Sequence, residues 1–315
     1  MQVVQASRAS AILYNLLVNR DNKLPWLLPA NICPIVPITF LKAETLFEFV
    51  DISAETLHMD LKQVDTLIKS RKFGGVVYAH TYGEESTPYD FFYKLKRLDA
   101  SLLLVDDRCL CIPKLEPDTD NWADVQLYST GYSKIVDFGI GGYAYLRVDL
   151  PYHPVHLPFD LNDYMQIERD YKQHVQGRSL YEYKDCNWLA TDADLPAWQD
   201  YTQQIKTGID SSLAQRTRLN SIYSFRLPPE LQLQDKFNGW RFNIRVQNKL
   251  KVIDAIFKAG LFVSSHYASL AGIMREGRCP QAELLFSEVI NLFNDHYFDE
   301  QKAEKVCTII LENLS

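Results

Sequence analysis

The first half of the chain alternates short apolar runs with amphipathic segments, and this alternation constrains the fold more than any other feature. The apolar runs are expected strands, at 26–28, 46–51, 75–80, 101–106, 124–129 and 142–148. Expected helices lie between several of them, at 9–17, 34–42, 61–70 and 90–98. Apolar runs with little internal alternation are typical of strands buried on both faces, and helices between them are typical of crossover connections. The pattern predicts an α/β protein with a mostly parallel sheet.

The texture of the sequence changes after about residue 149. A Pro-rich connector, PYHPVHLPFD, is followed by expected helices at 161–173 and 195–223. The remaining elements are an expected strand at 241–246, a helix at 249–258, a strand at 261–265 and helices at 280–293 and 300–314. We therefore expect a large domain over 1–150, a connector and long linking helix over 151–224, and a small C-terminal α+β domain over 225–315.

Composition excludes several classes of function. The chain has 33 Lys and Arg against 40 Asp and Glu, a net charge of −7, and no dense basic stripe, so nucleic acid is not an expected partner. No run approaches the roughly 18 apolar residues that span a bilayer, and the first residues do not read as a secretory signal. The six cysteines are dispersed and are expected to be free thiols. These features predict a cytoplasmic protein without a membrane segment.

Two of the expected strands end in residues with chemical use. Asp106 and Asp107 follow SLLLV, and Lys134 lies 27 residues beyond Asp107, in YSTGYSK after the next strand. Each residue alone is more often a cap or a surface charge. Because ligands bind outside the carboxyl ends of parallel strands, the aspartates and the lysine together predict one site.

These segments, with LLPANICPIVPITFLKA, FEFVDIS, VVYAHTYG, GIGGYA, NWLATD, SSHYASL and CPQAELLFSEVINLFND, give the chain a recognisable order of motifs. In that order and spacing the sequence resembles the DegT-type nucleotide-sugar aminotransferases, which depend on pyridoxal 5′-phosphate (PLP) and belong to the fold-type I aminotransferase superfamily. The resemblance covers nearly the whole chain. It implies a three-layer αβα fold with a mostly parallel mixed sheet and a smaller C-terminal domain.

The resemblance also implies roles for individual residues. Lys134 matches the lysine that binds PLP covalently and later moves a proton, which requires an unprotonated amine. Asp107 matches the carboxylate that keeps the pyridine nitrogen protonated. Phosphate contacts are implied for Ser7, Arg8, Ala9, Ser10, Ser129 and Asn187, the last reaching across from the partner in a homodimer with shared active sites. His266 and Tyr267 match a pair near the substrate cleft, and no metal is expected.

Some positions depart from the family pattern. The residues concerned are Leu110 in place of a glutamine, Asn31 or Cys33 in place of a ring-stacking aromatic, Gly131 in place of a histidine and Leu189 in place of an arginine. The chain also begins almost at the expected phosphate-binding helix. The leading hypothesis is PLP-dependent transamination of a keto nucleotide-sugar, with glutamate as the expected donor, in surface polysaccharide or amino-sugar biosynthesis. The alternative is a non-catalytic relative that keeps the fold and dimer as a binding or scaffolding protein.

Overall fold

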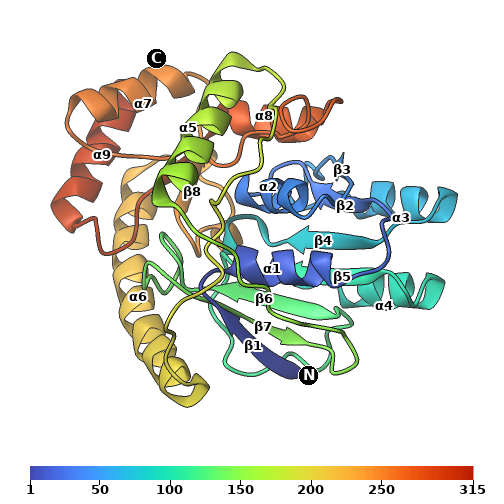
Figure 1. Ribbon diagram of the computed structural model, residues 1–315. Coiled ribbons are helices and arrows are strands. Elements are labelled where there is room, and N and C mark those ends of the chain that lie inside the picture. Colours follow the sequence, from blue (N-terminus) through green and yellow to red (C-terminus); the bar gives the residue numbers. More distant parts are fainter. Residues whose placement is uncertain (315) are drawn as a thin grey trace.

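A seven-stranded sheet forms the centre of the structure, a computed structural model in which residues 1–314 are described (Figure 1). Its strands are β1 (Gln2–Ala6), β2 (Trp26–Pro29), β3 (Phe47–Val50), β4 (Gly75–Ala79), β5 (Leu103–Asp107), β6 (Val125–Ser129) and β7 (Gly142–Leu146). They lie in the order β1-β7-β6-β5-β4-β2-β3. The five strands from β6 to β3 are parallel, whereas β7 is antiparallel to both of its neighbours, β1 and β6. This mostly parallel mixed sheet confirms the predicted fold class.

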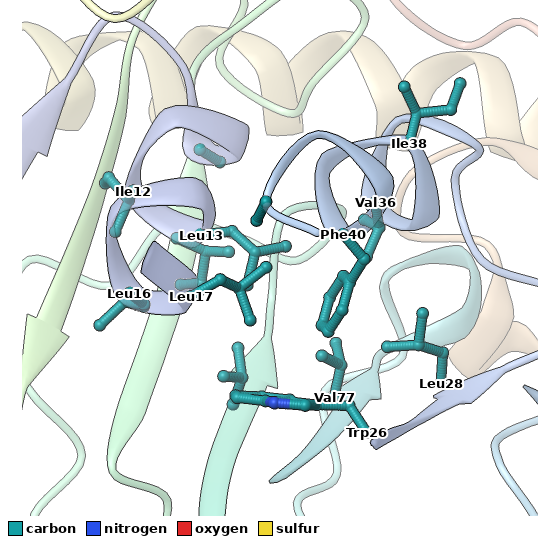
Figure 2. Close-up of a cluster of buried hydrophobic side chains, with 14 of the residues drawn as sticks. Ile12, Leu13, Leu16, Leu17, Trp26, Leu28, Val36, Ile38, Phe40 and Val77 are labelled. Carbon is teal, nitrogen blue, oxygen red and sulfur yellow. The ribbon is translucent and has the colours of Figure 1, made fainter. Parts of the chain in front are cut away.

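Helices cover both faces of the sheet. The first two, α1 (Ala9–Val18) and α2 (Ile35–Lys42), pack on one face, where Leu13, Leu17 and Phe40 point toward Trp26 (Figure 2). The other face is covered by α3 (Leu61–Ser70), α4 (Tyr89–Leu98) and the first turns of α6 (Trp198–Arg226). The molecule therefore has the predicted three layers.

Alternation along β5 decides which aspartate faces which layer. Leu103 and Val105 belong to the core beneath α1 and α2, whereas Leu104 belongs to the core beneath α3 and α4. Because successive side chains of a strand point to opposite faces, Asp107 lies on the α1 side and Asp106 on the α4 side. The two acids therefore belong to different environments.

The last third of the chain forms a second cluster of elements. Beyond α5 (Leu161–Gly177) and α6 come β8 (Phe242–Arg245), α7 (Lys249–Lys258), α8 (Pro280–Glu288), β9 (Val289–Leu292) and α9 (Glu300–Glu312), with short 3-10 turns η1 (Thr81–Gly83), η2 (Pro229–Leu231) and η3 (Asp235–Phe237). A core shared by the end of α6, β8, β9, α7 and α9 holds this part together. Figure 1 shows α9 beside the long α6.

Three sequence expectations in this fold were wrong or incomplete. The helix expected over 280–293 ends at Glu288, and Val289–Leu292 instead pairs with β8, as its β-branched Val-Ile start favours. The strand expected over 261–265 is reduced to a single bridge between Ser264 and Asn291. The edge strand β1 was not expected at all. Among the described helices, none is long and apolar enough to cross a membrane.

Candidate active site

The structure brings Lys134 and Asp107 to one region at the carboxyl edge of the sheet. Asp107 is the last residue of β5, and its Oδ1 accepts the N–H of Cys109 at 3.0 Å. Lys134 lies in the turn after β6, half-buried, and within residues 1–314 its amine has no hydrogen bond or ion pair. The charges of both residues act on the thiols of Cys33 and Cys109, which places the four side chains around a common space.

The two thiols make this space a poorly solvated one. Burial raises the pKa of Cys33, and Lys134 opposes the increase. Burial together with the Asp107 carboxylate raises the pKa of Cys109 well above its ordinary value. Both thiols are therefore neutral at physiological pH, and neither competes with Asp107 as an anion.

The loop that carries Lys134 is fixed from both sides. Ser133 has a left-handed backbone (φ +60°), and its N–H donates to Asp137 at 2.8 Å. The indole N–H of Trp240 donates to the Ser133 carbonyl at 2.7 Å, and the Arg216 guanidinium donates to the Lys134 carbonyl at 3.3 Å. Two residues from the C-terminal half of the chain thus hold the backbone that presents the lysine.

An anion cradle lies between the start of α1 and the end of β6. Arg8, the N-cap residue of α1, makes no capping side-chain hydrogen bond. The Gly141 N–H donates to the Ser7 carbonyl at 2.6 Å, and a Cβ on Gly142 would overlap the backbone of Arg8 and Ala9. Ser129, at the end of β6, accepts the N–H of Gly131 at 3.2 Å. The structure therefore brings the segment 7–10 and Ser129 together, with helix N–H groups of the kind that bind phosphate.

Individual members of the predicted phosphate set differ in what they do. Ser10 and Ser129 are buried, whereas the Ser7 hydroxyl donates to the carbonyl of Ala190 at 2.5 Å. The Arg8 guanidinium stacks over the ring of Tyr164, 4.7 Å from its centroid. These contacts leave main-chain groups and two serines as the donors that a phosphate would meet.

Asn187 is exposed on the segment that passes Ser7. Its backbone N–H donates to Asp163 at 2.8 Å, and its carbonyl accepts from Asp160 at 2.7 Å. Its backbone is thus fixed while its side chain faces outward. A contact between this side chain and a second subunit stays a prediction.

His266 and Tyr267 line the same region as Lys134. The Tyr82 hydroxyl donates to the His266 carbonyl at 2.7 Å, and the Trp240 ring lies parallel to that of Tyr267, 6.4 Å between centroids. Burial, helped by the Arg241 and Lys134 charges, lowers the pKa of His266 to about 3. Burial raises the pKa of Tyr267 well above its ordinary value, with Cys33 acting in the same direction. Both side chains are therefore neutral.

The structure separates the two residues considered for the ring-stacking position. Asn31 points away, because its amide donates to the Leu57 carbonyl at 3.2 Å and to Thr81 at 3.4 Å. Cys33 instead feels both Lys134 and Asp107. The thiol therefore lies where an aromatic ring was expected. Leu189, at another departing position, is fully buried in the core beneath α1.

Asp106 belongs to a separate polar cluster on the opposite face. Its carboxylate lies 2.7 Å from His80 Nε2 and 3.4 Å from the Arg108 guanidinium, and it accepts the Asn121 amide at 2.7 Å. His58, His80 and Glu84 have the spacing of metal ligands. However, His80 already directs Nε2 to Asp106 and Nδ1 to the Glu84 carbonyl at 2.6 Å, so it has no free nitrogen to offer a metal.

A cavity of about 950 Å³ adjoins the lysine loop. Its wall is formed by 134–138, by part of α6 between Gly208 and Arg218, and by 295–301. Of the residues predicted for the site, only Lys134 lines it within the described part of the chain.

Sequence reasoning missed Trp240, Arg216 and Tyr82, which position the lysine loop and His266. Trp240 and Arg216 are single residues more than 80 positions from Lys134, in segments without a motif. The strand-like RFNIRV that follows Trp240 was the one available signal, because a strand end can place the preceding side chain at a site.

Comparison with known proteins supports the fold. No protein-family model and no curated protein sequence matches the chain. Three solved structures are similar to it over nearly its whole length. An aminotransferase from Brucella abortus, described by the names DegT, DnrJ, EryC1 and StrS, has a TM-score of 0.70 at 14% identity, covering 100% of this chain and 86% of that one.

The second structure is a Streptococcus pneumoniae protein, named as a sugar aminotransferase, in its PMP form, with a TM-score of 0.70 at 17% identity over 100% of this chain and 87% of that one. The third is DesI in the presence of its TDP-sugar product, with a TM-score of 0.72 at 15% identity over 98% and 80%. The resemblance expected from the sequence is confirmed at the level of the fold: this chain has the fold of the DegT-type sugar aminotransferases.

Proposed function

We propose that the chain binds PLP and transfers an amino group to a keto nucleotide-sugar. The observation that carries the proposal is the unpaired amine of Lys134, held in a poorly solvated space that Asp107 also faces. A partly buried lysine without a carboxylate partner is unusual in a protein interior, where such charges are ordinarily paired. The full-length likeness of the fold to sugar aminotransferases supports the choice of cofactor.

The residues present fit PLP at each of its three polar groups. Lys134 offers the amine that its carbonyl carbon needs. Asp107 keeps Oδ2 without a hydrogen bond among residues 1–314, and so offers an acceptor to the pyridine N–H. The cradle of α1 with Ser10 and Ser129 offers hydrogen bonds to the phosphate. The space that Gly142 leaves beside Ala9 is what lets this cradle form.

The chain's own groups then divide the work. When bound, PLP supplies an electron sink that lets an amino acid lose its Cα proton. Lys134 Nζ accepts that proton and delivers it again, because its loop is held at the Ser133 and Lys134 carbonyls. Asp107 fixes the position and charge of the ring nitrogen. The neutral Cys33, His266 and Tyr267 enclose the site and keep water from the reacting carbon.

The finer parts of the proposal concern the donor, the assembly and the setting. We take glutamate as the amino donor and the biosynthesis of amino sugars or surface polysaccharide as the setting, in the cytoplasm. The active unit is a homodimer in which the exposed Asn187 of one subunit reaches the phosphate bound by the other. Light scattering and an Asn187→Ala variant with weakened PLP binding would support the dimer.

Absorbance spectroscopy tests the cofactor directly. Purified protein incubated with PLP should show a protein-bound chromophore, and borohydride should fix it to Lys134 as an adduct that mass spectrometry locates. Lys134→Ala should abolish both signals, whereas Lys206→Ala, at an exposed lysine of α6, should leave both unchanged. A wild-type protein with neither the band nor the adduct would refute the proposal and favour a non-catalytic binding protein.

A further inference from the structure

Two arginines are buried near the lysine loop, and they are partnered very differently. Arg216 and Arg241 are each 3% exposed. The Arg216 guanidinium donates to neutral acceptors on four residues, namely Ser212, Trp240, Asn294 and Lys134. It is a structural group whose hydrogen bonds hold the lysine loop against the C-terminal half of the chain.

Arg241 has no such set of acceptors. Its Nε and Nη1 are buried without a hydrogen-bond partner. Its Nη2 lies 3.9 Å from Asp295 Oδ2, beyond hydrogen-bonding distance. The guanidinium lies over the ring of Phe293, 3.5 Å from the centroid, and 4.8 Å from that of Trp240. Aromatic faces thus enclose a charge that nothing in the described chain neutralises by a hydrogen bond.

The charges around these arginines do not balance. The carboxylate nearest to Arg241 is Asp295, and Asp137, which also acts on Arg216, is engaged by two backbone N–H groups. Burial lowers the pKa of both Arg216 and Arg241 to about 10, so both remain charged at neutral pH. A buried cation without a bonded counter-ion is costly, and binding an anion would remove that cost.

Arg241 lies beside the candidate active site rather than in a remote part of the core. Its charge acts on His266 and Tyr267, and Lys134 also acts on His266. Trp240, over which the guanidinium lies, is the residue that holds the Ser133 carbonyl. An anion bound at Arg241 would therefore lie next to the lysine loop.

We propose that Arg241 is the receptor for a carboxylate group of the amino-acid donor and of the oxo acid formed from it. This assignment rests on the proposed function and specifies how its donor is held. A planar carboxylate suits a guanidinium enclosed by aromatic faces, and a side-chain carboxylate, Asp295, already lies near it. Phosphate groups have their own donors at the start of α1, on the far side of the lysine loop in sequence.

Calorimetric titration with glutarate tests the receptor without requiring any reaction. Glutarate has the carboxylates of the donor but no amine, so it binds without turnover, and glutaramide is its uncharged control. The full chain, with and without added PLP, should bind glutarate and not glutaramide. Arg241→Met should weaken glutarate binding about 10-fold or more, and Arg241→Lys should weaken it less. Arg226→Met, at an exposed arginine of α6 paired with Glu304, should bind as wild type does.

Thermal unfolding separates a receptor from a structural arginine. Without ligand, Arg241→Met should melt at or above the wild-type temperature, because it removes an uncompensated buried charge, whereas Arg216→Met should melt lower. Glutarate should raise the melting temperature of wild type and of Arg241→Lys but not that of Arg241→Met. Loss of folding in both Arg241 variants would overturn the assignment.

The remaining outcomes are also decisive. Unchanged glutarate affinity in Arg241→Met overturns the proposal, as does a variant that loses affinity for UDP while keeping glutarate, since the site would then bind phosphate. Glutarate binding that depends on Arg241 in a protein with no PLP chromophore would uphold the receptor and refute the cofactor. A PLP chromophore on Lys134 without Arg241-dependent glutarate binding would do the reverse.

Discussion

Asp106 and Asp107 are consecutive residues of one strand with opposite surroundings. Asp106 is fully buried and held by His80, Asn121 and Arg108. Asp107 is only half-buried and accepts one backbone N–H. Burial alone would raise the pKa of Asp106, but the neighbouring His80 and Arg108 hold it below its usual value. The face of the strand, rather than the residue type, separates the carboxylate that stabilises the fold from the one left available for chemistry.

Removing the buried carboxylate should have the largest effect of all. Asp106→Ala leaves the buried Arg108 and His80 without their counter-charge, so we expect it to lose about 3–5 kcal/mol of unfolding free energy. Asp107→Ala should lose no more than about 0.5 kcal/mol, because it removes a single N–H acceptor at a partly exposed position. Urea denaturation measures both. Equal losses would show that the two faces are not energetically different.

The same pair should reverse its order in an activity measurement. Asp107→Ala removes the group proposed to anchor the ring nitrogen, and electrostatic interactions of this kind are worth about 10²–10³-fold in rate. Asp106→Ala, assayed at a temperature where it remains folded, should keep its rate within about 10-fold of wild type. The assay follows amino transfer from glutamate. A rate that depends more on Asp106 would place the chemistry on the other face.

A smaller effect is expected where α1 approaches the sheet on the Asp107 side. The added methyl of Gly142→Ala would overlap the Ala9 backbone and displace the first turn of α1. Overpacking of this kind costs about 1–3 kcal/mol, and the displaced turn should weaken PLP binding. Melting temperature and spectroscopic PLP titration report the two effects. Gly177→Ala, which meets only a serine side chain at 3.7 Å, is the matched control and should change neither.

The smallest effect is a pH dependence from the Asp106 side. Burial, helped by the His80 charge, lowers the pKa of His58 to about 3, against 6.5 when unfolded. Between these values the unfolded chain binds a proton that the folded chain does not, so stability falls as pH decreases below 6.5. The slope is at most about 1.4 kcal/mol per pH unit.

His58→Phe should flatten that decrease. The substitution removes the titrating ring, keeps an aromatic side chain against Tyr78 and Phe237, and leaves no bond broken at Nε2, which has no partner. Denaturant midpoints at pH 7, 6 and 5 would show the change. An unaltered slope would mean that His58 is already protonated in the folded protein.

The sequence predicted those features that depend on local pattern and parallel strand order. Asp107 and Lys134 could be placed together because each follows a strand of one parallel sheet, and the alternation of β5 selects Asp107. Arg216, Trp240 and Arg241 could not be found in this way, since nothing in their local sequence records which loop they contact. The switch from α8 to β9 was missed because LLFSEVINLF stays apolar at helical spacing, and only pairing with β8 makes its end a strand.

The attachment of the lysine loop to Trp240 and Arg216 has a consequence for how the protein is made. A chain growing from its N-terminus completes all seven strands of the main sheet by residue 146, about 70 residues before the first of these anchors. The sheet can therefore assemble around a lysine whose backbone is not yet held. The site is the last part of the molecule to acquire its geometry, and a nascent chain has no working centre until its C-terminal half has folded against the first.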